Sequence, residues 1–171
     1  MSNVETIATG QFLTLVKSGR WEYVDRVRAN HAAIIVAVTP EQKLLLVEQY
    51  RVPVQRRTIE LPAGIIGDEP GAAGESAVAA AGRELWEETG YAAGHLEALT
   101  TGASCSGITS ERVTLFRATE LRRTGTGGGV ANEEITVHEI PLAEVPDWLV
   151  AQARGGRLID PKIYAGLYFI R

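Results

Sequence analysis

The segment Arg83-Glu84-Leu85-Trp86-Glu87-Glu88-Thr89-Gly90 decides the interpretation of this chain. It closes the clearest predicted helix, residues 75–89, which is rich in alanine, has a serine near its start and stops at a glycine. Glu84 lies one helical turn from Glu88 and next to Glu87 on the helix surface. The three carboxylates share one face in the last turn, where like charges repel and the helix dipole disfavours negative charge. Local energetics therefore give no reason to gather them there.

A bound divalent cation would account for this acidic face. Carboxylate ligands that leave positions open for water and phosphate suit Mg²⁺ or Mn²⁺. By spacing alone, an acidic face that is simply solvated is an alternative of equal standing.

The residues around the acidic face resemble the Nudix box, the signature of the Nudix hydrolases. The box reads G-x5-E-x7-R-E-U-x-E-E-x-G-U, where U is an aliphatic or aromatic residue. Glu75, seven intervening residues and the segment 83–91 match its second part without a gap. In the first part, Gly64 lies eleven residues before Glu75 instead of six, which predicts a five-residue insertion within 67–74. A longer loop costs little closure entropy, so the departure concerns the loop's shape more than the chemistry.

The resemblance extends over nearly the whole chain and points to the ADP-ribose pyrophosphatase branch of the Nudix hydrolases. The stretches that carry it are GRWEYVDR (19–26), LLLVEQYR (44–51), ELPAG (60–64) and SGITSER (106–112). It implies a Nudix α/β/α sandwich, with a mixed sheet between helices and an N-terminal β-strand appendage. It also implies a homodimer in which each appendage reaches across to the active site of the partner.

The resemblance implies hydrolysis of the pyrophosphate bond in a nucleoside diphosphate sugar, with Mg²⁺ as cofactor and Mn²⁺ as an alternative ion. Glu84 and Glu88 would ligate the metal, helped by the backbone carbonyl of Ala63, and Glu87 would assist through a water. Arg83 would orient these carboxylates. The alternative for Arg83 is a simple salt bridge on the helix surface.

Further roles follow from the resemblance for residues outside the helix. Glu75 would pair with Arg83 or reach an outer metal. Glu111 lies in a Gly/Ser/Thr-rich loop, a setting where catalytic residues often occur, and would activate water or hold metal. The alternative is an exposed loop carboxylate. The predicted substrate-binding residues are Trp21, which would stack on adenine, Arg26 and Arg51, which would hold phosphates, and Ser106 and Gly107.

Two points leave alternatives open. Trp21 could equally fill a core or an interface. Members of the branch that hydrolyse ADP-ribose typically carry a proline where this chain has Ser106. We therefore expect ADP-ribose as the substrate, with GDP-mannose or an ADP-hexose as the runner-up. A Nudix-fold sensor that binds a nucleotide without cleaving it is a further alternative, although sensors usually lose the box carboxylates retained here. A bare interaction domain would leave those carboxylates unexplained.

Composition narrows the class of protein. The 171 residues correspond to one ordinary domain, with 45% hydrophobic and 22% charged residues. The net charge of −4 argues against a nucleic-acid partner, and the single cysteine, Cys105, excludes an internal disulfide. The first ten residues do not resemble a signal peptide, and apolar runs such as 32–38 are far shorter than a membrane span. We expect a cytoplasmic protein without a membrane partner.

The remaining pattern predicts a mixed α/β domain, residues 31–171, preceded by a strand appendage, residues 1–30, for dimerisation and substrate contact. The predicted hairpins pair 11–16 with 21–27 and 32–37 with 43–50, the second buried on both faces. Further expected elements are strands at 57–61, 113–118 and 134–140, a loop at 64–74, a flexible glycine-rich segment at 124–129, and helices at 143–154 and 161–170, the last capped by Asp160.

Overall fold

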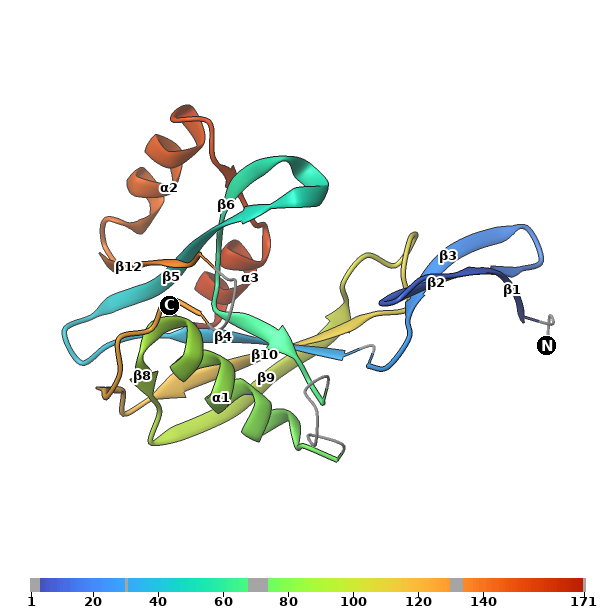
Figure 1. The fold of residues 1–171 in the computed structure, drawn as a ribbon. Helices are drawn as coiled ribbons and strands as arrows, with labels where there is room; N and C mark the ends of the chain where they lie inside the picture. The colour runs from blue at the N-terminus through green and yellow to red at the C-terminus, as the bar shows by residue number, and fades with distance from the viewer. Residues whose placement is uncertain (1–3, 30, 68–73, 130–133, 171) are drawn as a thin grey trace.

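The computed structural model describes residues 4–29, 31–67, 74–129 and 134–170. In these ranges the chain forms helices on both sides of a layer of β-strands, with a separate N-terminal sheet projecting from one end (Figure 1). The predicted α/β/α sandwich with a strand appendage is therefore confirmed. The strands between the helices form two four-stranded sheets in place of one.

Each four-stranded sheet contains one parallel pair among antiparallel neighbours. In the first sheet β4 is parallel to β10, and in the second β6 is parallel to β13. The first sheet has the order β7 (Ala63–Ile65), β4 (His31–Ala37), β10 (Arg112–Thr119) and β9 (His95–Ala103). The second has the order β12 (Thr136–Pro141), β5 (Lys43–Arg51), β6 (Arg56–Glu60) and β13 (Leu158–Ile159). A short pair joins β8 (Tyr91–Ala92) to β11 (Arg122–Arg123), and a 3₁₀ turn, Val52–Val54, links β5 to β6.

Strand β4 lies at the centre of the molecule, which explains its continuous apolar sequence. Ala33 and Ile35 pack in the cluster on the side of helix α1 (Ala77–Thr89). Ile34 and Val36 pack in the cluster that faces the C-terminal helices. Complete burial of a side chain such as Ile35 contributes roughly 1.5–3 kcal/mol. Both faces of the strand are thus covered, as the sequence predicted.

Local sequence signals predict the positions of the helices well. In α1 the side chain of Ser76 accepts a hydrogen bond from the amide of Ala79 at 3.2 Å, and Gly90 ends the helix with a φ of 76°. The later helices are α2 (Val145–Arg154) and α3 (Lys162–Phe169). Pro161 takes the capping position of α3, yet Asp160 accepts a hydrogen bond from the Lys162 amide at 2.8 Å.

The predicted pairing of 32–37 with 43–50 is wrong beyond the turn that joins them. A single bridge, Val38 with Leu44, connects the strands, which then enter different sheets. Each strand pairs with two other neighbours, β4 with β7 and β10, and β5 with β12 and β6. In the predicted loop 64–74, the first residues belong to β7, and the expected insertion falls largely on 68–73, outside the described residues.

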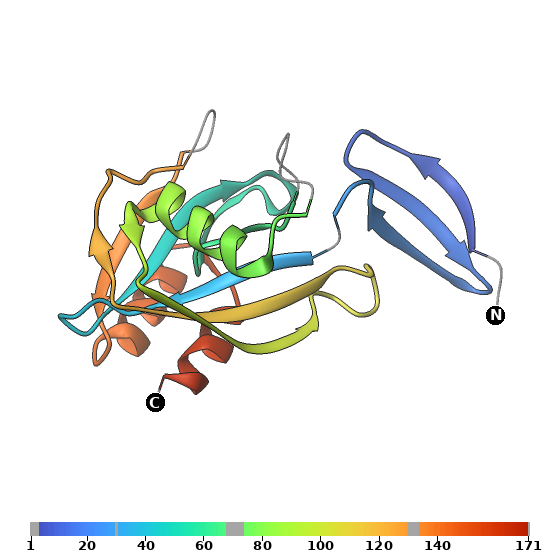
Figure 2. The same cartoon turned by 90° about the horizontal axis from the view of Figure 1, so that it is seen from below.

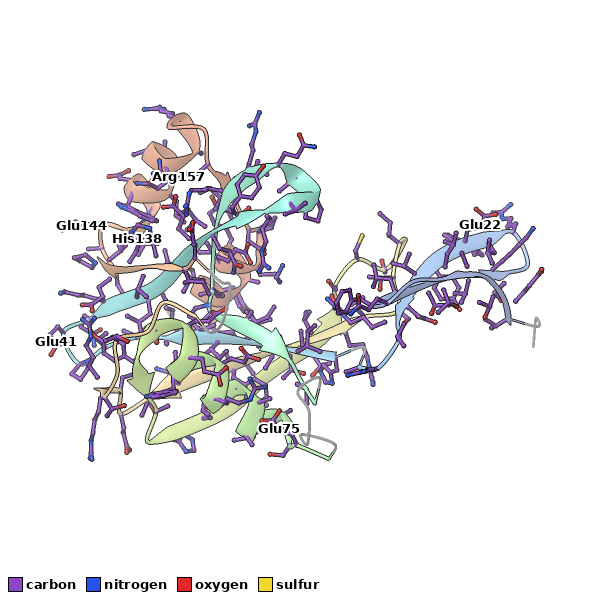
Figure 3. All side chains as sticks on the ribbon, in the orientation of Figure 1. Glu22, Glu41, Glu75, His138, Glu144 and Arg157 are labelled. Carbon is purple, nitrogen blue, oxygen red and sulfur yellow. The ribbon has the colours of Figure 1, made fainter. Side chains whose placement is uncertain are left out.

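A buried carboxylate ties the second sheet to the segment after α2. Glu48 is 4% exposed and accepts hydrogen bonds from His138 Nε2 at 3.0 Å and Arg157 Nε at 3.1 Å. His138 and Arg157 are labelled in Figure 3. Burial opposes the charge on Glu48, but these two hydrogen bonds outweigh it and lower the pKa of the carboxyl group.

The N-terminal sheet consists of β1 (Val4–Thr9), β2 (Leu13–Ser18) and β3 (Trp21–Arg26), all antiparallel. Figures 1 and 2 both show it beside the end of the first sheet rather than over a face of it. The Val24 amide donates to the carbonyl of Ile108 at 2.8 Å, so the contact runs through the loop between β9 and β10. The strand β1 was not predicted. None of the helices in the described ranges is long and apolar enough to cross a membrane.

Candidate active site

An acidic cavity of about 280 Å³ lies between the C-terminal half of α1, strand β7 and the loop before β10. Three predicted catalytic residues, Glu84, Glu88 and Glu111, line it. The predicted residues Arg26, Arg51 and Ala63 line it as well. Residues far apart in sequence thus meet around one space, as a binding site requires.

The end of α1 is fitted closely to strand β7. The Ala63 amide donates a hydrogen bond to Glu88 Oε2 at 3.1 Å, and Glu88 is 4% exposed. A Cβ placed on Gly64 would lie 1.8 Å from Cδ of Glu84. A larger residue would displace the Glu84 side chain from its present conformation. This gives a physical reason for the glycine that opens the box motif.

Arg83 contacts carboxylates on both sides of it in the sequence, one just before α1 and two on the helix itself. Its Nε and Nη2 donate to Glu75 at 3.1 and 3.2 Å, and Glu75 lies just before α1 (Figure 3). Its Nη1 donates to Glu84 at 2.9 Å and to Glu87 at 3.0 Å. These contacts, led by the hydrogen bonds to Glu75, raise the pKa of Arg83, and in return the pKa of Glu75 is lowered. Arg83 therefore contacts all three carboxylates, and its role in orienting them stays a prediction.

Two arginines bring positive charge to the cavity, each paired with a carboxylate. Arg51 forms a bidentate pair with Glu60 through hydrogen bonds of 2.7 and 2.6 Å, and these bonds raise the pKa of Arg51. Arg26, from the last position of β3, donates from Nε to Glu111 Oε1 at 2.5 Å. The N-terminal sheet thus contributes Arg26 to the lining of the cavity. The arginine forks match the geometry of phosphate oxygens.

Sequence reasoning missed four polar residues of the cavity wall: Gln49, Glu60, Ser104 and Lys162. Gln49 lies two positions before Arg51 on β5, and therefore on the same face of the strand. Glu60 stands in the stretch 60–64 quoted above, and its burial at 8% exposure could have been expected from the apolar residues around it. Lys162 is the first residue of α3, and nothing in the sequence around it indicates that it lies at the cavity.

The predicted residues Trp21, Ser106 and Gly107 lie together, but outside the acidic cavity. They line a second, open pocket of about 350 Å³ with Ser18, Tyr23 and Thr109. Trp21 is 59% exposed, so it does not serve as core within this chain. Between these two spaces, the loop at 104–111 is the shared element, because Ser104 and Glu111 line the acidic cavity.

The carboxylates of Glu84, Glu88 and Glu111 offer only oxygen atoms as ligands. Oxygen ligands are the type that a hard divalent cation such as Mg²⁺ prefers. As the side chains lie, however, no group of three His, Cys, Asp or Glu residues in the described ranges is placed to hold a metal ion. Glu87 does not line the cavity and is engaged with Arg83. Metal binding at Glu84, Glu87, Glu88 and Ala63 therefore stays a prediction, and it would exchange contacts of Arg83 for contacts with the ion.

The sequence of this chain is similar to the sequences of several known proteins. A "Methanol dehydrogenase activator" of Bacillus methanolicus is 30% identical over 146 residues, 85% of this chain and 74% of the relative. An "ADP-ribose pyrophosphatase" of Bacillus subtilis (strain 168) is 34% identical over 125 residues, 68% and 64% of the two chains. A "GDP-mannose pyrophosphatase" of Pectobacterium atrosepticum is 31% identical over 143 residues, 79% and 69% of the two chains.

A solved structure is similar over almost the full length. The crystal structure of an "ADP compounds hydrolase" matches with a TM-score of 0.72 and 25% identity, and covers 99% of this chain and 90% of that one. The NUDIX domain family matches residues 29–159, which include α1, β7 and the loop with Glu111. The box resemblance, the cavity and these matches agree: the chain belongs to the NUDIX domain family and is a Nudix pyrophosphatase, as its sequence predicted.

Proposed function

We propose that the protein hydrolyses the pyrophosphate bond of ADP-ribose to AMP and ribose 5-phosphate in a Mg²⁺-dependent reaction. The observation that carries the proposal is the meeting of Glu84, Glu88 and Glu111 with Arg26 and Arg51 around one cavity. Such a cavity can neutralise a diphosphate from the arginine side and supply oxygen ligands and a proton acceptor from the other. The relatives named for ADP-ribose and ADP compounds support this choice.

The metal would be held by Glu84, Glu88 and the carbonyl of Ala63, with Glu87 assisting, and Mn²⁺ is an alternative ion. Bound there, the ion would supply charge to the phosphate oxygens and orient the attacking water. Glu88 is already fixed by its bond to the Ala63 amide, so one ligand is positioned before any ion arrives.

Glu111 acts as the proton acceptor in this proposal. Water adds its oxygen to one phosphorus, its proton passes to Glu111, and the bond from that phosphorus to the bridging oxygen breaks. Arg26 and Arg51 bind the phosphate oxygens, in exchange for part of their present contacts with Glu111 and Glu60. Release of Glu111 from Arg26 by the incoming phosphate would free the carboxylate for the proton.

Trp21 is proposed to stack on adenine, with Ser106 and Gly107 beside it. In one chain its pocket is distinct from the acidic cavity. A homodimer whose N-terminal sheets cross to the partner would allow Trp21 to serve the other active site. The division into an appendage, residues 1–30, and a catalytic domain, residues 31–171, is part of the same proposal, as is a cytoplasmic enzyme acting on a small molecule.

GDP-mannose is the second candidate substrate, because four similar proteins are named "GDP-mannose pyrophosphatase" and Ser106 stands where the ADP-ribose branch typically has a proline. An ADP-hexose would fit the same mechanism. A sensor that binds without hydrolysis is less well supported, because the cavity retains its carboxylates.

The reaction is tested by incubating the purified protein with ADP-ribose and Mg²⁺ and identifying the products by chromatography. We expect AMP and ribose 5-phosphate in equal amounts, and no products after chelation of the metal. The matched variant Glu88→Gln should retain the fold, because an amide oxygen can still accept from Ala63. It should lose most of the turnover, because the neutral amide is a poor ligand for Mg²⁺. Turnover near that of the wild type in this variant would refute the role of Glu88.

A further inference from the structure

The segment 124–129, here called the glycine collar, lies against the C-terminal end of α1. The amides of Thr124 and Gly125 both donate to the carbonyl of Gly90, at 2.9 and 3.0 Å. The sequence predicts a flexible segment here, and in the structure repeated backbone contacts link the collar to the helix.

The collar also reaches the two glutamates of the last turn through their backbones. The Gly128 amide donates to the carbonyl of Glu88 at 2.8 Å, and the Gly129 amide donates to that of Glu87 at 3.0 Å. A helix end leaves such carbonyls without partners and places a partial negative charge there. The collar amides donate hydrogen bonds to these carbonyls and offset the partial negative charge of the helix end. The carboxylates of the same turn add further negative charge at this place. This explains how α1 can end in a cluster of carboxylates.

The collar and the end of α1 contact each other through backbone atoms. A Cβ on Gly127, which has a φ of +66°, would lie 2.4 Å from the carbonyl carbon of Thr89 and 2.8 Å from the amide nitrogen of Gly90. A Cβ on Gly90 would lie 2.4 Å from the carbonyl oxygen of Gly125. No flexible side chain is available to yield at these contacts, so a larger residue must move the collar or the end of the helix.

Movement of the helix end would reach the cavity directly. Glu88 is held by the collar at its carbonyl and by the Ala63 amide at its carboxylate. Thr89, which the Cβ of a substituted Gly127 would meet, is the next residue and is fully buried. A displacement there changes the position of the Glu88 carboxylate relative to β7.

We propose that the glycine collar sets the position of the acidic turn of α1, and that Gly127 is its principal positioning residue. Gly127 touches neither substrate nor metal, and it acts through Thr89 and Glu88. The inference rests on the proposed function in that it assigns the metal to the carboxylates of this turn.

The test compares Gly127→Ala with Gly156→Ala. Gly156 also has a positive φ, +89°, but a Cβ there meets nothing within 4 Å, so this control carries backbone strain without a collision. The two readouts are Mn²⁺ affinity, by electron paramagnetic resonance without substrate, and the kcat and KM for ADP-ribose. We expect Gly127→Ala to weaken Mn²⁺ binding about tenfold and to lower kcat by about ten- to a hundredfold. KM should change by less than about twofold, and Gly156→Ala should match the wild type in all three quantities.

Wild-type Mn²⁺ affinity and kcat in Gly127→Ala would overturn the proposal, and so would equal losses in both variants. If the wild type binds Mn²⁺ but does not cleave ADP-ribose, the proposed substrate fails while Mn²⁺ affinity still decides the role of the collar. If Gly127→Ala does not fold, Gly125→Ala replaces it. Its Cβ would meet Nε1 of the Trp86 side chain at 3.2 Å and the Cα of Gly90 at 3.6 Å, which is a milder contact with the same end of the helix. A smaller loss of Mn²⁺ affinity is then expected, and an unchanged affinity contradicts the proposal.

Discussion

Arg26 and Glu111, 85 positions apart in the chain, are joined by an ion pair in which Nε and Oε1 lie 2.5 Å apart. One residue ends the N-terminal sheet and the other precedes β10, and the pair lines the acidic cavity where the two parts of the molecule meet. The same pair joins a predicted phosphate ligand to the predicted base.

Replacing Glu111 tests its assignment as the proton acceptor. Glu111→Gln keeps a hydrogen-bond acceptor for Arg26 but removes the basic carboxylate. We expect kcat for ADP-ribose to fall by about 10²–10⁴, with KM changed far less, in steady-state assays. Glu97→Gln on β9 replaces an exposed carboxylate outside the cavity and should leave both constants unchanged. A kcat within a few-fold of the wild type for Glu111→Gln would rule out this role.

The contact between Arg83 and Glu75 should make stability depend on pH. The pKa of Glu75 in the folded protein is lowered by Arg83, so the stabilisation is present above the usual carboxyl pKa and disappears as the pH falls through the folded value. For a pair that contributes about 1 kcal/mol, Glu75→Gln should lower Tm by about 2–4 °C at neutral pH. The difference from the wild type should shrink as the pH is lowered below the usual carboxyl range.

Thermal melts of Glu41→Gln serve as the control for that pH series, since Glu41 is an exposed glutamate in the turn after β4. Its Tm should follow the wild type across the whole range. If the gap between the wild type and Glu75→Gln stays constant instead, Arg83 does not hold down the pKa of Glu75.

Removing Trp21 distinguishes stacking on a base from a structural role. If adenine stacks on Trp21, Trp21→Ala should raise KM for ADP-ribose by about tenfold while kcat stays within about twofold, because the lost contact binds substrate and transition state alike. Tyr164→Ala removes an aromatic side chain of similar exposure from α3 and should change neither constant. An unchanged KM for Trp21→Ala would instead assign Trp21 to packing or to a protein interface.

Ser106 offers a test of specificity with little risk to the fold. The Ile108 amide donates to the Cys105 carbonyl at 3.0 Å, which makes Ser106 the second residue of a turn, a position that proline favours. We expect Ser106→Pro to be neutral or to stabilise by about 0.4–1 kcal/mol, and to raise the ratio of kcat/KM for ADP-ribose over GDP-mannose. Ser106→Ala separates loss of the hydroxyl from gain of the ring. A ratio that does not differ among the three proteins would remove Ser106 from the specificity argument.

The parts of the site that the sequence predicted are those specified by local signals. Ser76 and Gly90 mark the ends of α1, and the spacing of Glu84 and Glu88 places them on one face whatever the helix packs against. Ala63 and Gly64 were found because they stand in a motif. The geometry at Gly64 gives the physical reason for its glycine, which the motif alone does not.

The parts that were missed depend on which distant segments meet. Glu60 lies at the cavity because of the register in which β6 pairs with β5, and Lys162 lies there because α3 packs nearby. No local sequence pattern specifies either arrangement. The apolar runs of β4 and β5 predicted burial correctly, but burial does not say which strands pair. The glycines of the collar were interpreted as flexible because a sequence shows their conformational freedom and not the close approach that requires it.

The most direct test of the account is kcat/KM of the wild-type protein, with Mg²⁺, for ADP-ribose, GDP-mannose, ADP-glucose and UDP-glucose. We expect the highest value for ADP-ribose, with AMP and ribose 5-phosphate as products. A higher value for GDP-mannose would keep the cavity chemistry but contradict the assigned substrate. Nucleotide binding without hydrolysis of any of the four would contradict the proposed reaction itself.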